Sequence, residues 1–445
     1  MCASRPEPPA PEAPDSLRER LRRLGLADPA RSRADTRAAG DGHLARPHVG
    51  VPGRGSGVER IRAEYALDRR HGRCVLGDAL EAIAAPPAGA GAAPGGRVRG
   101  LDLARTAYVD IETTGLAGGT GTYAFLIGVA YVDGQALVTE QFLLHHLGAE
   151  RRLLASLQEC LARARHLVTF NGRRFDWPIL EARLVLARER PLPLEDHTDL
   201  IQPARWLWHR VLGTHRLSTL EAEVLGARRP NDVPGWLIPA IYVEYLRRGD
   251  RASLDPVLAH NRADLLAMVA LHGEVARILR DPDAARGPLD WEGAGVLLAR
   301  EGRHREALAC LDRAAALAPD PDARWRILRR VARAYRLLGD ADGARARWER
   351  EAAVWIGPDR LRVRLLEEVA KARARRGDAD GARRAVEEAL GLARRLCGPA
   401  ANDPPPDLRR LTERLSGRLA RLEGRCRLPI LPPGERDRKA APGPQ

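Results

Sequence analysis

The stretch AYVDIETTGLAGGTG at residues 107–121 combines the pattern of a buried strand with that of a polar site. An apolar run leads to Asp110 and Glu112 and then passes into threonine and glycine. Side chains two apart in a strand share one face, so these two acids lie close together. Carboxylate oxygens are the ligands that Mg²⁺ and Mn²⁺ prefer. The stretch predicts a strand that ends at a divalent metal site; a solvated strand end with a polar rim is the alternative.

Strand and helix patterns alternate around this stretch, over residues 101–280. Three antiparallel strands are expected first, with an Asp-Gly turn between the second and third. A helix, a strand, a helix, a short strand and further helices follow. The expected ranges are 107–112, 123–132 and 136–146 for the first strands, then 149–164, 166–171, 176–188 and 197–201. The order is typical of a mixed α/β sheet of the ribonuclease H type with flanking helices.

The C-terminal part repeats itself at intervals of 37 and 38 residues. Each repeat has a glycine followed five residues later by an alanine. These pairs are Gly302 and Ala307, Gly339 and Ala344, and Gly377 and Ala382. Glycine at a turn between helices and a small residue at their crossing are typical of helical hairpins, and tetratricopeptide repeats have a period of about 34 residues. We expect an all-α domain of tetratricopeptide-like hairpins at 287–397, with a surface for a protein partner; an ordinary helical bundle is the alternative.

The remaining segments have the composition of connecting or terminal regions. Residues 1–57 are rich in Pro, Arg and Ala and are predicted to be disordered. A structured lead-in begins at Val58, and a linker is expected at 84–100, so that the α/β domain spans 58–280. Residues 398–445 form a Pro-rich basic tail with one helix expected at about 408–422.

The chain of 445 residues has a formal net charge of +14, concentrated outside the α/β domain. Residues 281–445 hold 35 basic and 26 acidic residues, whereas 101–280 hold 21 of each. A basic chain favours a nucleic-acid partner, although the near absence of lysine points to coding bias as another cause. The six cysteines show no metal-ligand or disulfide spacing, and no apolar segment is long enough to span a bilayer. We expect a cytoplasmic protein without a membrane partner.

Two further acids fall at helical positions. Asp176, in TFNGRRFDWPIL, comes near the start of a helix, where it can either cap the helix or reach toward the first strand. His260 and Asp264, in AHNRADLLAMVAL, are four apart on a helix and share one face. This pair either faces a site or is solvated.

Taken together, Asp110, Glu112, Asp176 and Asp264 reproduce the four-carboxylate pattern of the DEDD exonucleases, a ribonuclease H-like superfamily. Residues of about 58–280 more closely resemble its bacterial YprB-like branch, and the C-terminal repeats also suit that branch. The blocks that carry the resemblance are DIETTGLAGGTGTYAFLIGVAY, TFNGRRFDWPIL, HTDLIQPARWLW, LSTLEAEVLGARRPNDVPGWLIPAIYVEYLRRGD and HNRADLLAMVAL.

The resemblance implies that the four acids bind two divalent cations, Mg²⁺ or Mn²⁺. It also implies a 3′–5′ exonuclease that acts on RNA or single-stranded DNA by a two-metal-ion mechanism. One such ion generates hydroxide while the other stabilises the leaving oxygen. His260 occupies the position of the residue that orients or deprotonates the attacking water, and an unperturbed pKa of about 6.5 leaves its imidazole neutral near pH 7–8. Its place four residues before the final Asp is a hybrid, because the two main patterns have Tyr four or His five residues before it.

The resemblance further implies that the loop after Glu112 meets the terminal nucleotide, through backbone amides of Thr113, Thr114 and Gly115. Gly118, Gly119 and Gly121 permit close approach, although an ordinary mobile loop fits equally well. Asn171 is a candidate for support of the site, with a turn-forming Asn-Gly pair as the alternative.

Two functions of different classes remain open. The first is the metal-dependent exonuclease. The second is an interaction scaffold whose helical repeats recruit partners while the nuclease fold is vestigial. The intact set of four acids favours the enzyme.

Overall fold

The computed structural model describes residues 48–49, 57–85, 100–115, 121–397 and 406–424. The chain divides into two compact units, one ending at Ala294 and the other beginning at Gly295. Almost all of the predicted disordered segment, most of the predicted linker, Gly118, Gly119 and much of the predicted tail lie outside the described residues. Among the helices that are described, none has both the length and the apolar character needed to cross a membrane.

The first unit is built on a mixed sheet with the strand order β1-β2-β7-β6-β5-β8-β9. The strands are β1 (His48–Val49), β2 (Val58–Ala66), β5 (Thr106–Thr113), β6 (Ala124–Asp133), β7 (Ala136–Leu144), β8 (His166–Thr169) and β9 (Asp196–Asp199). The predicted antiparallel meander is confirmed, because β6 pairs with both β5 and β7 in antiparallel fashion. β8 and β9 continue the sheet in parallel from β5. The predicted mixed α/β fold with flanking helices is therefore confirmed.

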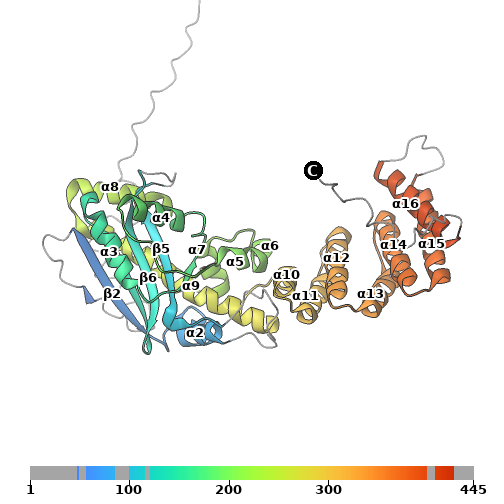
Figure 1. Ribbon diagram of the computed structural model, residues 1–445, viewed down its shortest axis with the longest axis horizontal. Helices are drawn as coiled ribbons and strands as arrows, with labels where there is room; N and C mark the ends of the chain where they lie inside the picture. The colour runs from blue at the N-terminus through green and yellow to red at the C-terminus, as the bar shows by residue number, and fades with distance from the viewer. Residues whose placement is uncertain (1–47, 50–56, 86–99, 116–120, 398–405, 425–445) are drawn as a thin grey trace, which may run out of the picture. The chain divides into compact units, whose positions relative to one another are not determined.

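Helices cover both faces of this sheet (Figure 1). On one face α2 (Leu76–Ala84) and α9 (Asp255–Arg280) bury Leu80, Leu265 and Met268 against Tyr108 of β5. On the other face α3 (Glu150–Cys160), α4 (Asp176–Leu186) and α8 (Ile238–Arg248) pack over a cluster that includes Val109. Because side chains alternate along a strand, Asp110 shares the face of Tyr108 and lies on the side of α9.

The chain between β9 and α9 is mainly helical, as predicted, and forms short elements. These are α5 (Ile201–Leu207), α6 (His209–Leu212), α7 (Leu217–Leu220), η5 (Glu221–Leu225), η6 (Gly235–Leu237), α8 and η7 (Arg251–Leu254). The lead-in before the sheet contains a hairpin of β3 (Arg70–His71) and β4 (Cys74–Val75) followed by α2. The remaining short turns are η3 (Leu103–Arg105), η4 (Leu147–Ala149) and η8 (Pro282–Ala284).

The second unit is helical throughout its described residues. Its helices, with the one that leads into it, are α10 (Trp291–Arg300), α11 (His304–Ala316), α12 (Pro321–Leu337), α13 (Ala341–Val354), α14 (Asp359–Arg375), α15 (Ala379–Cys397) and α16 (Pro406–Leu422). The three repeat glycines, Gly302, Gly339 and Gly377, have φ values of 79°, 69° and 80° and stand between consecutive helices. Glycine adopts this left-handed conformation without a steric penalty, which explains its recurrence at the turns. The tetratricopeptide-like assignment itself stays a prediction.

A buried ion pair links strand β2, which lies beside the edge strand β1, to the region before α9. Glu59, with 4% of its side chain exposed, accepts hydrogen bonds from Arg251 at 2.7 and 3.0 Å. Burial alone would raise the pKa of Glu59, but hydrogen bonds from His145 and Arg251 lower it to about 2. A carboxylate with a depressed pKa stabilises the fold above its unfolded pKa, and this contribution is lost as the pH falls through the folded value.

We therefore expect Glu59→Gln to lower the free energy of unfolding at pH 7 by about 2 kcal/mol. The difference from the wild type should shrink as the pH falls from about 4.5 toward 2, as followed by chemical denaturation. The control is Glu64→Gln on the same strand, because Glu64 is 57% exposed and its pair with Arg62 contributes little. Equal losses in the two variants would contradict this account of Glu59.

Candidate active site

Asp110 and Glu112 lie near the C-terminal end of β5, at the centre of the sheet. Asp110 is opposite Gly128 of β6, and Glu112 is opposite Leu126. The pairing becomes irregular between Glu112 and Thr113, where the strand leaves the sheet. Both acids are thus placed by a strand whose preceding residues, Ala107 to Val109, are buried.

A chain of amide side chains fixes Asp110. The Nδ2 of Asn261, on α9, donates to the carboxylate of Asp110 at 2.8 Å and to its backbone carbonyl at 3.2 Å. Gln141 on β7 orients this amide by donating from Nε2 to the Oδ1 of Asn261 at 2.8 Å. A Cβ on Gly128 would stand 2.2 Å from that oxygen, so glycine is needed here to admit Asn261. The neutral donor can only partly offset the charge of Asp110.

Asp176 is the first residue of α4, and Phe175 occupies the N-cap position. The interpretation of Asp176 as the capping residue is therefore wrong. The backbone N–H groups of Asp176 itself and of Ile111 stabilise its ionised form. The paired residues of β8 end opposite Tyr108, which leaves this edge of β5 open near Ile111. Asp176 therefore reaches β5 between the two acids of the strand.

Asp264 and His260 lie together on α9, as their spacing predicted. The Nε2 of His260 is 3.4 Å from the Oδ2 of Asp264 and 3.9 Å from the Oε1 of Glu112. The side chains of these three residues are only 14–16% exposed. The alternative of a solvated pair is thus wrong, and the helix brings His260 to the acids of β5.

The loop between η5 and α8 supplies two charged residues that sequence reasoning missed, Arg229 and Asp232. Asp232 is 2.7 Å from the Nδ1 of His260 through its Oδ1, so Nε2 is turned toward the acids. The NH2 of Arg229 is 2.7 Å from Asp264, and its Nε is 2.5 Å from Glu221. The segment ARRPND that holds them has no periodicity, and its charges alone look like those of a solvated loop.

Burial and mutual repulsion raise the pKa of the site carboxyls. Desolvation is the largest cause for both Asp110 and Asp264, and both pKa values are raised. Repulsion from neighbouring acids adds to desolvation at Asp110, whereas Arg229 and His260 partly offset it at Asp264. Desolvation likewise raises the pKa of Glu112 to about 8 and that of Asp176 to about 6. A site of this kind favours any cation that enters it.

His260 and Arg229 provide positive charge beside Asp264. Burial alone would lower the pKa of His260, but the hydrogen bond with Asp232 and the charges of Asp264 and Glu112 raise it to about 9. Three carboxylates surround the ring and favour its protonated form in this arrangement without cations, and the neutral imidazole at pH 7–8 stays a prediction for the site with cations bound. An additional cation among the acids would weaken the attraction that holds this proton.

The donor set fits divalent cations, since it consists of hard carboxylate oxygens with a collective excess of negative charge. Asp110, Glu112, Asp176 and Asp264 are the residues that would hold them. Within the described residues, however, no group of three or more His, Cys, Asp or Glu side chains has an arrangement suited to a metal ion. The ion pairs of Asp264 with Arg229 and His260 occupy its oxygens, so loading with metal requires these side chains to reorient.

A protein-family model and a bacterial relative match the sequence of this chain. Residues 107–276 match the RNase_H superfamily. All five predicted catalytic residues, as well as Arg229 and Asp232, fall within the matched span. The chain is also 36% identical over 212 residues to a protein of Bacillus subtilis (strain 168) named "Uncharacterized protein YprB". That match covers 47% of this chain and 51% of the relative, so the chain spans about half the length of the relative it matches.

The predicted contact loop is partly tied to the sheet. Thr113 donates from Oγ1 to the carbonyl of Gly115 at 2.8 Å, and Thr114 exchanges hydrogen bonds with the backbone of Tyr123. The amide of Thr114 is therefore used within the protein, which leaves the amides of Thr113 and Gly115 as candidates for a nucleotide. A Cβ on Gly121 would meet nothing within 4 Å, so this position is open.

Asn171 has a φ of 66°, as expected of a turn-forming residue. Its N–H donates to the Oδ1 of Asp199 at 2.6 Å, and the N–H of Arg173 is 3.3 Å from the other oxygen. Asp199 thereby holds the loop that leads into Asp176. The structure gives Asn171 a role in shaping the turn, and a role in binding stays a prediction.

Proposed function

We propose that this protein is a metal-dependent 3′–5′ exonuclease that hydrolyses RNA or single-stranded DNA by a two-metal-ion mechanism. The observation that supports the proposal is the convergence of four partly buried acids from β5, α4 and α9, whose pKa values are all raised. The match of residues 107–276 to the RNase_H superfamily supports phosphodiester chemistry. An intact set of acids also argues against a vestigial fold.

The residues of the chain would divide the chemistry among themselves. Asp110, Glu112, Asp176 and Asp264 would hold the cations, which when bound supply an activated water and stabilise the leaving oxygen. With cations bound among the acids, the attraction that raises the pKa of His260 would be weakened, and the neutral ring would accept a proton at Nε2, since its other nitrogen is held by Asp232. Arg229 would balance the charge of Asp264 and Glu221 while no cation is bound among the acids.

Polarity is tested with single-stranded RNA and DNA labelled at either end. A 3′–5′ exonuclease releases the label of a 3′-labelled strand as a mononucleotide at the earliest times, while a 5′-labelled strand shortens step by step. We expect both patterns in the presence of Mn²⁺. Labelled oligonucleotides of intermediate length from the 3′-labelled strand at early times would contradict 3′–5′ exonuclease action while leaving hydrolysis itself intact.

Two exposed aromatic residues close in sequence to charged residues of the site are candidates for stacking on bases. Phe175, directly before Asp176, is 54% exposed, and Trp236, four residues after Asp232, is 61% exposed. Aromatic stacking contributes about 1–3 kcal/mol per base to single-strand binding. An aromatic ring exposed to this degree has a face available for such a contact.

We expect Phe175→Ala and Trp236→Ala each to raise the KM for a single strand by about tenfold with a smaller effect on kcat. Steady-state kinetics with a labelled strand measures both constants. Val185→Ala is the control, because Val185 is a 75% exposed apolar residue of α4 that lies away from the start of the helix. A fall in kcat with an unchanged KM would contradict the stacking role.

A further inference from the structure

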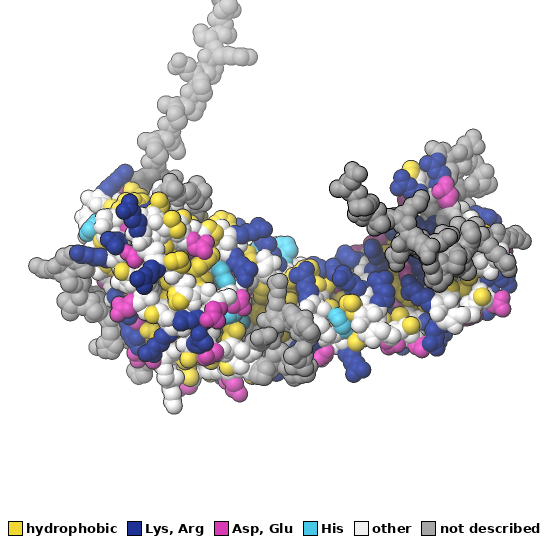
Figure 2. All heavy atoms as spheres, in the orientation of Figure 1, with side chains coloured by type: hydrophobic (Ala, Val, Ile, Leu, Met, Phe, Trp, Pro, Cys, Tyr) yellow, Lys and Arg dark blue, Asp and Glu magenta, His cyan; other side chains and the backbone are white. Residues whose placement is uncertain are grey.

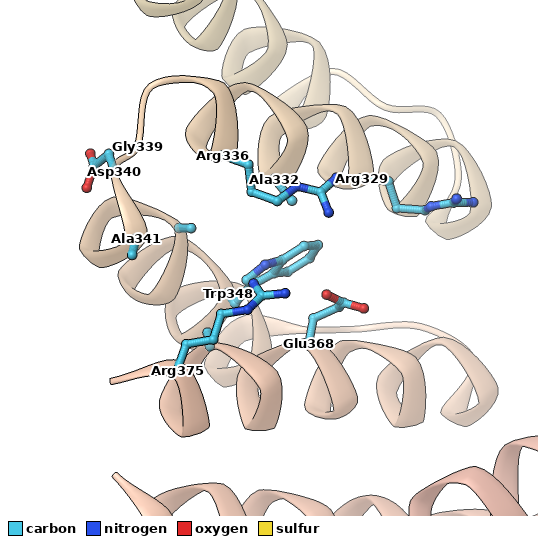
Figure 3. A pocket seen from close by; sticks show the side chains of 11 residues that line it. Arg329, Ala332, Arg336, Gly339, Asp340, Ala341, Trp348, Glu368 and Arg375 are labelled. Carbon is cyan, nitrogen blue, oxygen red and sulfur yellow. The ribbon is translucent and has the colours of Figure 1, made fainter. Parts of the chain in front are cut away.

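Two adjoining cavities in the helical unit are lined by basic residues. The first, of about 420 Å³, lies between α12, α13 and α14 and is shown in Figure 3. The second, of about 320 Å³, lies between α12, α14 and α16. Arg329 and Glu368 line both cavities, so the two are neighbours, and their combined lining is named here the arginine groove.

Five arginines of this groove make no side-chain hydrogen bond or ion pair with any described residue. They are Arg329, Arg336, Arg364, Arg375 and Arg418. The Nε of Arg418 is in addition buried without an acceptor. In Figure 3, Arg336 and Arg375 extend from α12 and α14 toward the ring of Trp348 between them. Guanidinium groups that line a groove without carboxylate partners favour an anion in it.

The acids that line the groove already have partners. Glu367 accepts from Arg414 at 3.1 and 3.2 Å and is 3.0 Å from Lys371. Glu368 pairs with Lys371 at 2.7 Å, and Asp340 caps α13 by accepting from Gly343 at 2.7 Å. The groove is therefore left with a surplus of positive charge. Figure 2 shows basic side chains gathered over the helices of this unit.

The spacing of the arginines favours a polymer over a single phosphate. Arg329 and Arg336 are seven residues apart on α12, which corresponds to about 10 Å along one helix face. Arg364 and Arg375 are eleven residues apart on α14, or about 16 Å. Cations spread over such a length can each contact a different phosphate of one strand, which a single phosphate ion cannot do, and the planar fork of arginine pairs well with phosphate oxygens.

We propose that the arginine groove binds the phosphate backbone of single-stranded RNA or DNA, as a second nucleic-acid site outside the acidic centre. The choice of nucleic acid over an acidic protein segment rests on the proposed function, because a chain that hydrolyses strands gains from a second contact with them. Binding in the groove is independent of sequence, since the backbone carries no base information.

The test measures binding of fluorescein-labelled oligouridylate and oligothymidylate of about 20 nucleotides to the full chain. EDTA is present throughout, so that no strand is hydrolysed. The groove variant carries Arg329→Ala, Arg336→Ala and Arg375→Ala. The control carries Arg305→Ala, Arg384→Ala and Arg395→Ala, three exposed arginines of the same unit that line neither cavity. Circular dichroism checks that both variants fold.

We expect the groove variant to bind about 10- to 100-fold more weakly and its salt dependence to fall by about 2 in log–log slope. Arg→Lys at the same three positions should keep most of that slope, because it keeps the charge. The control should change affinity by about twofold or less. EDTA prevents hydrolysis, so this experiment measures binding alone. A loss of binding in the groove variant would therefore support the groove even if the protein hydrolyses no strand, and hydrolysis without such a loss would reject the groove alone.

Three outcomes would overturn the inference. Equal losses in the groove and control variants would mean that overall charge alone governs binding. Displacement of the strand by inorganic phosphate at the same phosphate concentration would mean that the groove takes isolated anions. Tighter binding of poly-glutamate than of either strand, lost in the groove variant, would assign the groove to acidic protein segments.

Discussion

Asp110→Asn is expected to reduce the rate of phosphodiester hydrolysis by about three orders of magnitude or more, because it removes one of the four carboxylates proposed to hold the ions. The exchange is nearly isosteric, and the Oδ1 of an asparagine can still accept the hydrogen bond of Asn261. The loss is therefore assigned to charge and not to packing. It is measured as initial rates with a labelled single strand and Mn²⁺.

The same variant is expected to unfold at a higher temperature than the wild type when no divalent ion is present. The pKa of Asp110 is raised in the folded state by burial and by repulsion from Asp264, Glu112 and Asp176. A carboxyl with a raised pKa costs stability as the pH rises above its unfolded value of about 4. At pH 7–8 the neutral asparagine removes this cost.

With divalent ions present, the wild type should unfold at a higher temperature than Asp110→Asn. Binding to the folded wild type adds about 2.7 kcal/mol at an ion concentration 100 times the Kd, whereas the variant gains less. Asp133→Asn is the control, since Asp133 is a 62% exposed acid of the neighbouring strand β6. Full activity of Asp110→Asn, or equal stabilisation of both proteins by Mn²⁺, would contradict the assignment of this acid.

His260→Ala is expected to lower kcat by about 10²- to 10⁴-fold, the usual contribution of a positioned acid or base. Asp232→Asn should lower kcat by a smaller factor, because Asp232 acts through the ring it holds at 2.7 Å. Two residues that act as a unit are not additive. The double variant is therefore expected to be no slower than His260→Ala.

Stabilisation by Mn²⁺ distinguishes a role of His260 in proton transfer from a role in maintaining the structure of the site. His260→Ala should still be stabilised by Mn²⁺, because the four acids remain. Asp255→Asn, a 70% exposed acid of the same helix, serves as the control and should keep wild-type kinetics. Multiplicative losses from His260→Ala and Asp232→Asn would show that the two residues do not act together.

The sequence was sufficient for the centre of the fold, where local patterns and tertiary contacts agree. The apolar run before Asp110 predicted β5, and the stripe of Leu265, Met268 and Val269 predicted α9. These elements carry three of the four acids, and a spacing of two or four residues is enough to place side chains on one face.

The edge of the sheet could not be predicted in the same way. The strand β2 was anticipated only as part of a structured lead-in. Its buried residues Ile61, Ala63 and Tyr65 alternate with Arg62 and Glu64, which is the pattern of a half-buried strand but does not show where in the sheet the strand lies. Its partner β7 lies about 80 residues later in the chain, and local patterns do not report such pairings.

Two charged residues of the site could not be predicted for a different reason. Arg229 and Asp232 belong to a loop without periodicity, and their significance depends on the approach of that loop to α9. The surroundings of His260 could not be predicted for the same reason, because the three acids that raise its pKa come from separate segments. Such effects appear only when the fold brings the segments together.

Whether the four acids support metal-dependent hydrolysis is measured most directly as the initial rate of nucleotide release from single-stranded RNA and DNA, with Mn²⁺ and with chelator. The measurement compares the wild type with Asp110→Asn, Glu112→Gln, Asp176→Asn and Asp264→Asn. The account predicts hydrolysis by the wild type with Mn²⁺ alone, with loss of activity in chelator and in each of the four variants. Activity that survives chelation, or a wild type as inert as its variants on every strand, would contradict it.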